Sequence, residues 1–296
     1  MRLTELLEGV TDALVPADLV ADLRAQLDDA ARAAVDGIDP DALPLRVPKD
    51  RLAKVLACEQ LAVATAQHGA LSEPVVRGRI LDRLLHHHVH GAGPVPGPAL
   101  AIAEGAFDAE RDDEVVAWLG ERIEERARLA DDATGFAERL RDLGPLDADW
   151  WPRCEDRLRV DLADGRVVCS AQLDLVVGGR PTERPMVVVE VKSGRFGQDH
   201  REGLFWYALL AALRHPTPPS AVIGWSAWDG AGWIQPVTEP VLRGAAERAT
   251  IAFDRLGALA HGRTPVRTPC RACAWCPEQS TCPVAPVPDD EDDDDG

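Results

Sequence analysis

The stretch Met186-Val187-Val188-Val189-Glu190-Val191-Lys192 decides the fold. Its first four residues are apolar, so both faces are apolar there, which is typical of a strand buried in the middle of a sheet. Because side chains alternate along a strand, Glu190 and Lys192 fall on the same face. The sequence therefore predicts a central strand that ends in a carboxylate and an ammonium placed side by side.

A second apolar strand, Gln172-Leu173-Asp174-Leu175-Val176-Val177, carries an acid in its middle. Burying a lone carboxylate is costly, so Asp174 needs a partner. A divalent cation shared by Asp174 and Glu190 would serve, and carboxylate oxygens suit Mg²⁺ or Mn²⁺. The alternative is that Glu190 and Lys192 form a simple ion pair at the end of a strand.

The flanking sequence predicts an α/β fold with a mixed, partly antiparallel sheet. Ala- and Leu-rich segments with apolar residues three and four apart predict helices up to about residue 145. Beyond Trp150, β-rich runs alternate with turn signals such as Asp164-Gly165 and Gly178-Gly179. The expected strands cover residues 154–162, 166–177, 184–194, 220–228 and 232–237, and the expected later helices cover 200–215 and 238–260.

We expect four regions along the chain. They are an N-terminal helical region (1–149), an α/β core (150–262), a cysteine segment (263–286) and a disordered acidic tail (287–296).

Charge excludes one class of function. The 296 residues carry a net charge of −18, and without the seven acids of residues 289–295 the remainder still carries −11. Such a chain does not coat nucleic acid by bulk charge. No apolar run is long enough for a membrane span, and the N-terminus is acidic where a secretory signal would be basic. We therefore expect a cytoplasmic protein with no membrane partner.

Four cysteines lie close together, in the pattern Cys270-x2-Cys273-x2-Cys276-x5-Cys282. In a cytoplasmic chain such clustering indicates a metal or cluster site more often than disulfides. Zinc sites are usually built from two Cys-x2-Cys pairs separated by a longer loop, so zinc is the alternative rather than the first expectation.

The constellation Asp174, Glu190-Val191-Lys192 and a following helix resembles the PD-(D/E)XK nuclease superfamily, in particular its RecB-like branch. The resemblance implies a restriction-endonuclease-like core and metal-dependent hydrolysis of DNA. It also implies that Asp174, Glu190 and the carbonyl of Val191 bind the metal, while Lys192 orients or deprotonates the attacking water. Lysine is rare in this chain, with only Lys49, Lys54 and Lys192.

Two accessory motifs of the RecB-like branch match imperfectly. The Gly-x3-His motif, whose His is a further metal ligand, corresponds to Gly78-x3-Asp82, so the resemblance implies Asp82 as a ligand. A solvated helix face is the alternative for Asp82. The Gln-x3-Tyr motif, which positions substrate, keeps Tyr207 but has Gly203 in place of Gln, with Arg201 nearby.

The cysteine spacing resembles that of the iron–sulfur nucleases of this superfamily, namely the AddB-type subunit and the CRISPR-adaptation exonucleases. The resemblance implies a structural 4Fe–4S cluster held by Cys58, Cys273, Cys276 and Cys282, with Cys270 spare. The alternative uses Cys270 and leaves Cys58 in the core.

Taken together, these resemblances imply an Mg²⁺- or Mn²⁺-dependent deoxyribonuclease, of exonuclease type, in DNA repair, recombination or anti-phage defence. Its partners would be DNA and a helicase or other subunit of such a pathway. Two alternatives stay open: a non-cleaving DNA-binding or scaffold protein of the same fold, and a zinc-stabilised structural protein.

Overall fold

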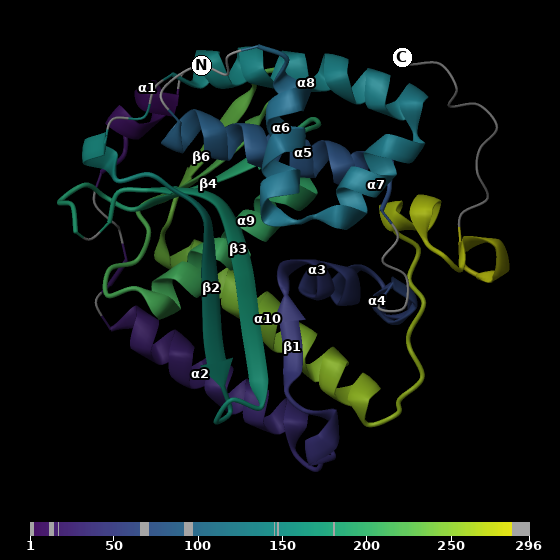
Figure 1. Ribbon diagram of the computed structural model, residues 1–296. Helices are drawn as coiled ribbons and strands as arrows, with labels where there is room; N and C mark the ends of the chain where they lie inside the picture. The colour runs from purple at the N-terminus through teal and green to yellow at the C-terminus, as the bar shows by residue number, and fades with distance from the viewer. Residues whose placement is uncertain are drawn as a thin grey trace. The chain divides into compact units, whose positions relative to one another are not determined.

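The computed structural model describes residues 3–11, 15–16, 18–65, 71–91, 97–144, 146, 148–179 and 181–285. They form two compact units built from interleaved parts of the chain. Figure 1 labels the helices and strands and colours the ribbon from the N-terminus to the C-terminus. The first unit comprises Met1–Asp22, Leu71–Arg159 and Ala171–Ala245, and the second comprises Leu23–Ala70, Val160–Ser170 and Ala246–Gly296. The units follow three-dimensional contacts, whereas the regions expected from the sequence follow chain order.

Helices make up most of the chain before residue 145. They are α1 (Leu3–Glu8), α2 (Leu19–Val35), α3 (Lys49–Ala57), α4 (Glu59–Thr65), α5 (Glu73–His90), α6 (Ala99–Glu110), α7 (Asp113–Glu121) and α8 (Ile123–Leu143). Two long helices follow later, α9 (Gln198–Arg214) and α10 (Glu239–Ala260). Short 3₁₀ turns cover Pro40–Ala42, Ala148–Trp150, Arg271–Trp275 and Gln279–Thr281.

The predicted α/β class and the mixed sheet are confirmed. The strands are β1 (Leu45–Pro48), β2 (Arg153–Leu162), β3 (Val167–Val177), β4 (Val187–Lys192), β5 (Ala221–Ser226) and β6 (Gly232–Pro236). Their order is β1-β3-β4-β5-β6, and β2 also pairs with β3. The ladders β1–β3 and β4–β5 are parallel, whereas β3–β4 and β5–β6 are antiparallel.

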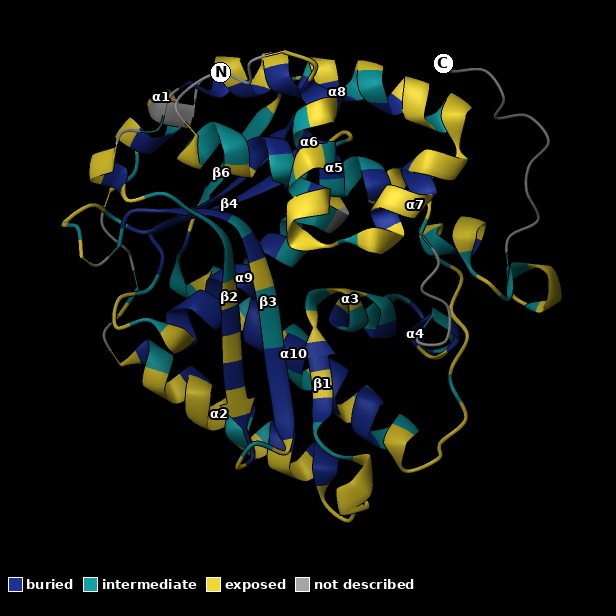
Figure 2. Ribbon diagram, viewed as in Figure 1, coloured by how far each residue is buried: buried dark blue, intermediate teal, exposed yellow. Residues whose placement is uncertain are grey.

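The core of the first unit lies between the sheet and the helices α5 to α8. Alternate residues of β4, including Val187, Val189 and Val191, pack into one cluster with apolar residues of these helices. Figure 2 shows β4 as one of the most deeply buried strands of this unit. Helix α9 contacts β4 and β5, and the core cluster between the sheet and α5–α8 contains none of its described residues. The apolar run quoted first is therefore central, as expected.

The second unit contains a strand that the sequence did not predict. β1 pairs in parallel with Val167–Ser170 at the start of β3. It has only four residues and ends in Pro48, and such short, proline-bearing segments are confined to sheet edges and give a weak sequence signal.

The segment 49–69, whose Ala- and Leu-rich pattern predicts one helix, is interrupted at Cys58 within its described part. This residue has an extended backbone (φ −160°, ψ 121°) that separates α3 from α4. Arg255 of α10 donates hydrogen bonds to the carbonyls of Val55 and Leu56, both at 3.0 Å. Because these bonds satisfy carbonyls at the end of α3, the helix can end there.

The acidic tail expected at residues 287–296 lies outside the described residues. Among the helices that the structure does describe, none combines the length and the apolar character that crossing a membrane requires.

Helix α10 contains two glycines that predict opposite effects on stability. A Cβ at Gly257 would overlap the backbone carbonyl of Ala34 in α2, whereas a Cβ at Gly244 has open space around it. Gly257→Ala should lower the free energy of unfolding by about 1–3 kcal/mol through overpacking. Gly244→Ala should raise it by up to about 1 kcal/mol through helix propensity. Urea denaturation of both variants beside the parent measures this, and equal effects would contradict the close approach of α2 and α10.

Candidate metal and nuclease site

Asp174 and Glu190 meet where the ladder between β3 and β4 ends. The paired register runs from Val177↔Val187 to Leu175↔Val189. Beyond it, the N–H of Val191 donates to Oδ2 of Asp174 at 2.8 Å. The same register continued by one residue sets Asp174 opposite Glu190, on a shared face. A hydrogen bond from the backbone of the Glu-Val-Lys motif therefore holds the Asp174 side chain next to that motif.

Glu190 is deeply buried, with 2% of its surface exposed. The ammonium of Lys192 forms an ion pair with its Oε1, as the alternation along β4 predicts. Lys192 itself is partly exposed, with 27% of its side chain accessible. One end of this pair is therefore in the core and the other reaches solvent.

The acids here are crowded. Burial, and then the nearby Glu190 carboxylate, raise the pKa of Asp174 well above its ordinary value, although Lys192 acts in the opposite direction. Burial also raises the pKa of Asp82, on α5, to about 6; Glu155 and Glu190 add to this shift, while Lys192 and Arg83 oppose it. Asp82 thus lies within electrostatic range of the Glu-Val-Lys motif.

Sequence reasoning missed two neighbours of these acids. Glu155, near the start of β2, interacts electrostatically with Asp82. Cys154 lies close enough that burial, followed by the charges of Glu155, Asp174 and Asp82, raises its pKa to about 12. No motif marks either position, because both are brought in by the fold of β2 rather than by spacing along the chain.

The residues expected to position substrate lie on α9. Tyr207 is buried, with 4% of its surface exposed. The guanidinium of Arg201 lies over the ring of Trp233 in β6, 4.9 Å from its centre. The roles of these two residues stay predictions.

The cysteines gather in the second unit. Cys58, Cys270, Cys273, Cys276 and Cys282 all line one small cavity. Backbone N–H groups point at two of the sulfurs, from Thr268 to Cys58 at 3.5 Å and from Cys270 to Cys273 at 3.3 Å. Burial and the neighbouring thiols of Cys273 and Cys58 raise the pKa of Cys270. The fold therefore brings Cys58 to the C-terminal cysteines across more than 200 residues of sequence.

Glu59, the residue after Cys58, fastens the C-terminal segment to this place. It is 5% exposed, and it accepts hydrogen bonds from Arg263 at 2.7 Å and from the N–H of Val266 at 2.8 Å. Gln60 adds a hydrogen bond to Glu278 at 2.7 Å. Burial alone would raise the pKa of Glu59, but the bonds from Arg263 and Val266 outweigh it and lower that pKa.

Neither constellation has the geometry of a loaded metal site. In the described part of the chain, no three His, Cys, Asp or Glu side chains are arranged so as to hold a metal ion. The donor chemistry nevertheless fits. Asp82, Asp174 and Glu190 interact electrostatically with one another and with Lys192, and carboxylate oxygens are the ligands that a hard divalent cation prefers. The five thiols are soft ligands, and hydrogen bonds to sulfur are typical of cluster sites.

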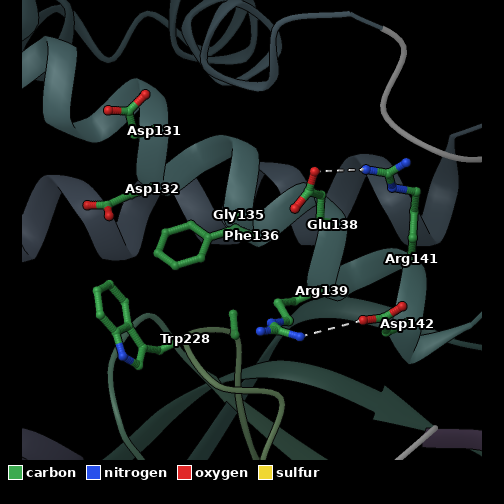
Figure 3. A pocket seen from close by; sticks show the side chains of 10 residues that line it. Asp131, Asp132, Gly135, Phe136, Glu138, Arg139, Arg141, Asp142 and Trp228 are labelled. Atoms are coloured by element: carbon green, nitrogen blue, oxygen red, sulfur yellow. Dashed lines mark ion pairs between the residues drawn. The ribbon is translucent and has the colours of Figure 1, made fainter.

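A separate open groove of about 630 Å³ lies between α8 and the turn after β5 (Figure 3). Trp228, which is 51% exposed, faces Phe136 and the acids of α8 across it. The groove contains none of the acids described above. Ala227, which precedes Trp228, also lines the groove, and its N–H donates to the carbonyl of Lys192 at 2.8 Å.

Comparison with known proteins assigns neither a family nor an activity to this chain. No protein-family model and no curated protein sequence matches the chain. Among twelve chains of solved structures that do match, SSO0001 is 11% identical over 89% of this chain and 96% of its own length, with a TM-score of 0.36. A "putative exonuclease" from Eubacterium rectale is 11% identical over 82% of this chain and 90% of its own, with a TM-score of 0.49. Identities this low carry no information on activity.

The contacts of Glu59 predict a pH-dependent contribution to stability. Because its pKa is lowered in the folded state, the stabilisation is present above the pKa of the unfolded chain and is lost as the pH falls through the folded value. Glu59→Gln should lower the free energy of unfolding by about 1–3 kcal/mol at pH 7. The difference in free energy of unfolding between variant and parent should become smaller as the pH falls from about 5 to 3. Denaturation at several pH values measures it, and a gap independent of pH would contradict the charged role of Glu59.

Proposed function

We propose that this protein is a metal-dependent deoxyribonuclease that hydrolyses phosphodiester bonds. The observation that supports it most is the hydrogen bond from Val191 to Asp174, which joins the mid-strand acid to the buried Glu190 and to Lys192. A simple strand-end ion pair would not require a second carboxylate from the neighbouring strand. The crowding of Asp82, Asp174 and Glu190 around a single ammonium further favours a cation site.

In this proposal Asp174, Glu190 and Asp82, with the carbonyl of Val191, would hold Mg²⁺ or Mn²⁺. A cation bound there would supply Lewis-acid chemistry toward water and the phosphate. Lys192 would orient the attacking water through its partly exposed side chain, whose ammonium pairs with Glu190. Its amine would accept a proton from that water only after losing its own. Tyr207 and Arg201, on α9, position the substrate.

The finer assignments belong to the same proposal. We infer an exonuclease of DNA repair, recombination or anti-phage defence, which works in the cytoplasm on DNA, together with a helicase or another subunit. These assignments follow from the resemblance of the Asp174/Glu190/Lys192 constellation to RecB-like nucleases.

Asp174→Asn tests the catalytic assignment with little risk to the fold. Its amide oxygen can still accept the N–H of Val191, and loss of the charge relieves repulsion with Glu190. Cleavage of end-labelled single- and double-stranded DNA with Mn²⁺ should fall by about a hundredfold or more, while the melting temperature stays equal or rises. Glu190→Gln and Lys192→Ala should also abolish cleavage.

Asp131→Asn is the matched control, because Asp131 is an exposed acid of α8 that lines the separate groove. It should cleave DNA as the parent does. Parental activity in the Asp174, Glu190 and Lys192 variants would instead mean that the chain is not a nuclease of this kind.

We further propose a structural 4Fe–4S cluster held by Cys58, Cys273, Cys276 and Cys282. The support is the cavity that all five cysteines share and the N–H groups directed at Cys58 and Cys273. Such a cluster would link α3 and α4 to the C-terminal segment. It would thereby stabilise a contact between residues far apart in the sequence, whose formation costs the entropy of closing a long loop.

Colour tests the cluster. Anaerobically purified protein should be brown and absorb near 400 nm, and Cys58→Ser should lose this absorbance and melt at a lower temperature. Cys270→Ser is the matched control and should keep its colour. The reverse result would assign Cys270 as the fourth ligand, and a colourless protein with bound zinc would replace the iron–sulfur proposal.

A further inference from the structure

Arg83, the residue after Asp82 on α5, joins three elements of the first unit. Its guanidinium bonds Glu155 at the start of β2 at 2.7 Å and Glu110 at the end of α6 at 2.6 Å. It also lies over the ring of Phe107, 5.8 Å from its centre. Only 14% of the side chain is exposed. These contacts attach α5 to β2 and α6 at the residue next to Asp82.

Glu155 makes its contact from an unusual backbone. It has a left-handed conformation (φ +53°) inside the strand β2. This conformation is unfavourable for a residue other than glycine, so the surroundings must stabilise it. The regular alternation of buried and exposed residues along β2 begins only after this point. The bend thus turns the Glu155 side chain out of the strand pattern, and its carboxylate bonds Arg83.

We infer that Glu155, acting through Arg83, is a positioning residue for Asp82 in the metal site. The inference rests on the proposed function, since it assigns Asp82 a ligand's role. Arg83 binds the Glu155 carboxylate in an ion pair, so Glu155 is engaged with this arginine rather than with the cation that Asp82, Asp174 and Glu190 would hold. The same bond sets the rotation of α5 at the turn that carries Asp82.

Three substitutions of Glu155 distinguish the effects of its contact with Arg83, of its negative charge and of its left-handed backbone. Glu155→Gly deletes the carboxylate but favours the left-handed backbone, so the fold should keep its melting temperature. Glu155→Ala deletes the carboxylate and keeps the strain. Glu155→Gln keeps an oxygen that accepts from Arg83 and removes only the charge.

A control on the same helix removes a comparable tie elsewhere. Arg79 of α5 bonds Asp112, the residue just before α7, at 3.1 and 3.3 Å. Asp112→Ala therefore loosens α5 one turn before Asp82 without touching the acids of the site.

The measurement is Mn²⁺ affinity by isothermal titration calorimetry at pH 7.5, beside thermal melting. Partners that orient a metal ligand contribute about tenfold or more to affinity. Glu155→Gly and Glu155→Ala should therefore weaken Mn²⁺ binding about tenfold, while Glu155→Gln and Asp112→Ala bind within about twofold of the parent.

Other outcomes overturn the inference in distinguishable ways. Parental Mn²⁺ affinity in Glu155→Gly would show that Glu155 does not position Asp82. Equal losses in Glu155→Gln and Glu155→Gly would assign the effect to charge rather than to the contact, and an equal loss in Asp112→Ala would assign it to any loosening of α5. A parent protein that binds no Mn²⁺ would remove the metal site, and the proposed function with it.

Discussion

Two carboxylates on neighbouring central strands constrain much of this structure. Asp174 and Glu190 are held in a region of low solvent access, where each raises the cost of charge on the other. The apolar residues of β3 and β4 fix the register that brings them together, since a slip by one residue would turn every side chain to the other face. The ion pair of Lys192 with Glu190 and the hydrogen bond from the N–H of Val191 to Asp174 then offset part of the cost of burying the two carboxylates.

The sequence predicted these features because each has a local signal. The four consecutive apolar residues before Glu190 indicate a buried strand. Asp174 lies among apolar residues of another strand, so its carboxylate needs a partner. The spacing of two between Glu190 and Lys192 puts both on one face. The strands after residue 150 and the helix after Lys192 have similarly strong local patterns, and the structure has them within a few residues of the expected ends. Features that depend on six or seven neighbouring residues, such as a buried strand or a shared face, can therefore be predicted from a single sequence.

What the sequence did not reveal depends on contacts from far along the chain. The helix break at Cys58 is stabilised by Arg255, and β1 exists only because the start of β3 offers it an edge. The left-handed bend at Glu155 has no residue signal at all, because glutamate does not favour it. The interleaving of the two units has the same origin, since chain order is a poor guide to which segments pack together.

The acidity of the chain fits a site in which cations do the work of binding phosphate. In α5, the arginines Arg77, Arg79 and Arg83 are each paired with acids of α6, α8, β2 or the turn before α7. Arginines used in this way stabilise the helices and leave little positive potential for a polyanion. On the proposed function, attraction to DNA then arises within a few ångströms of a bound cation, of Lys192 and of Arg201. At such distances salt screens weakly and the net charge of −18 matters little, so an acidic body and a nuclease site are compatible.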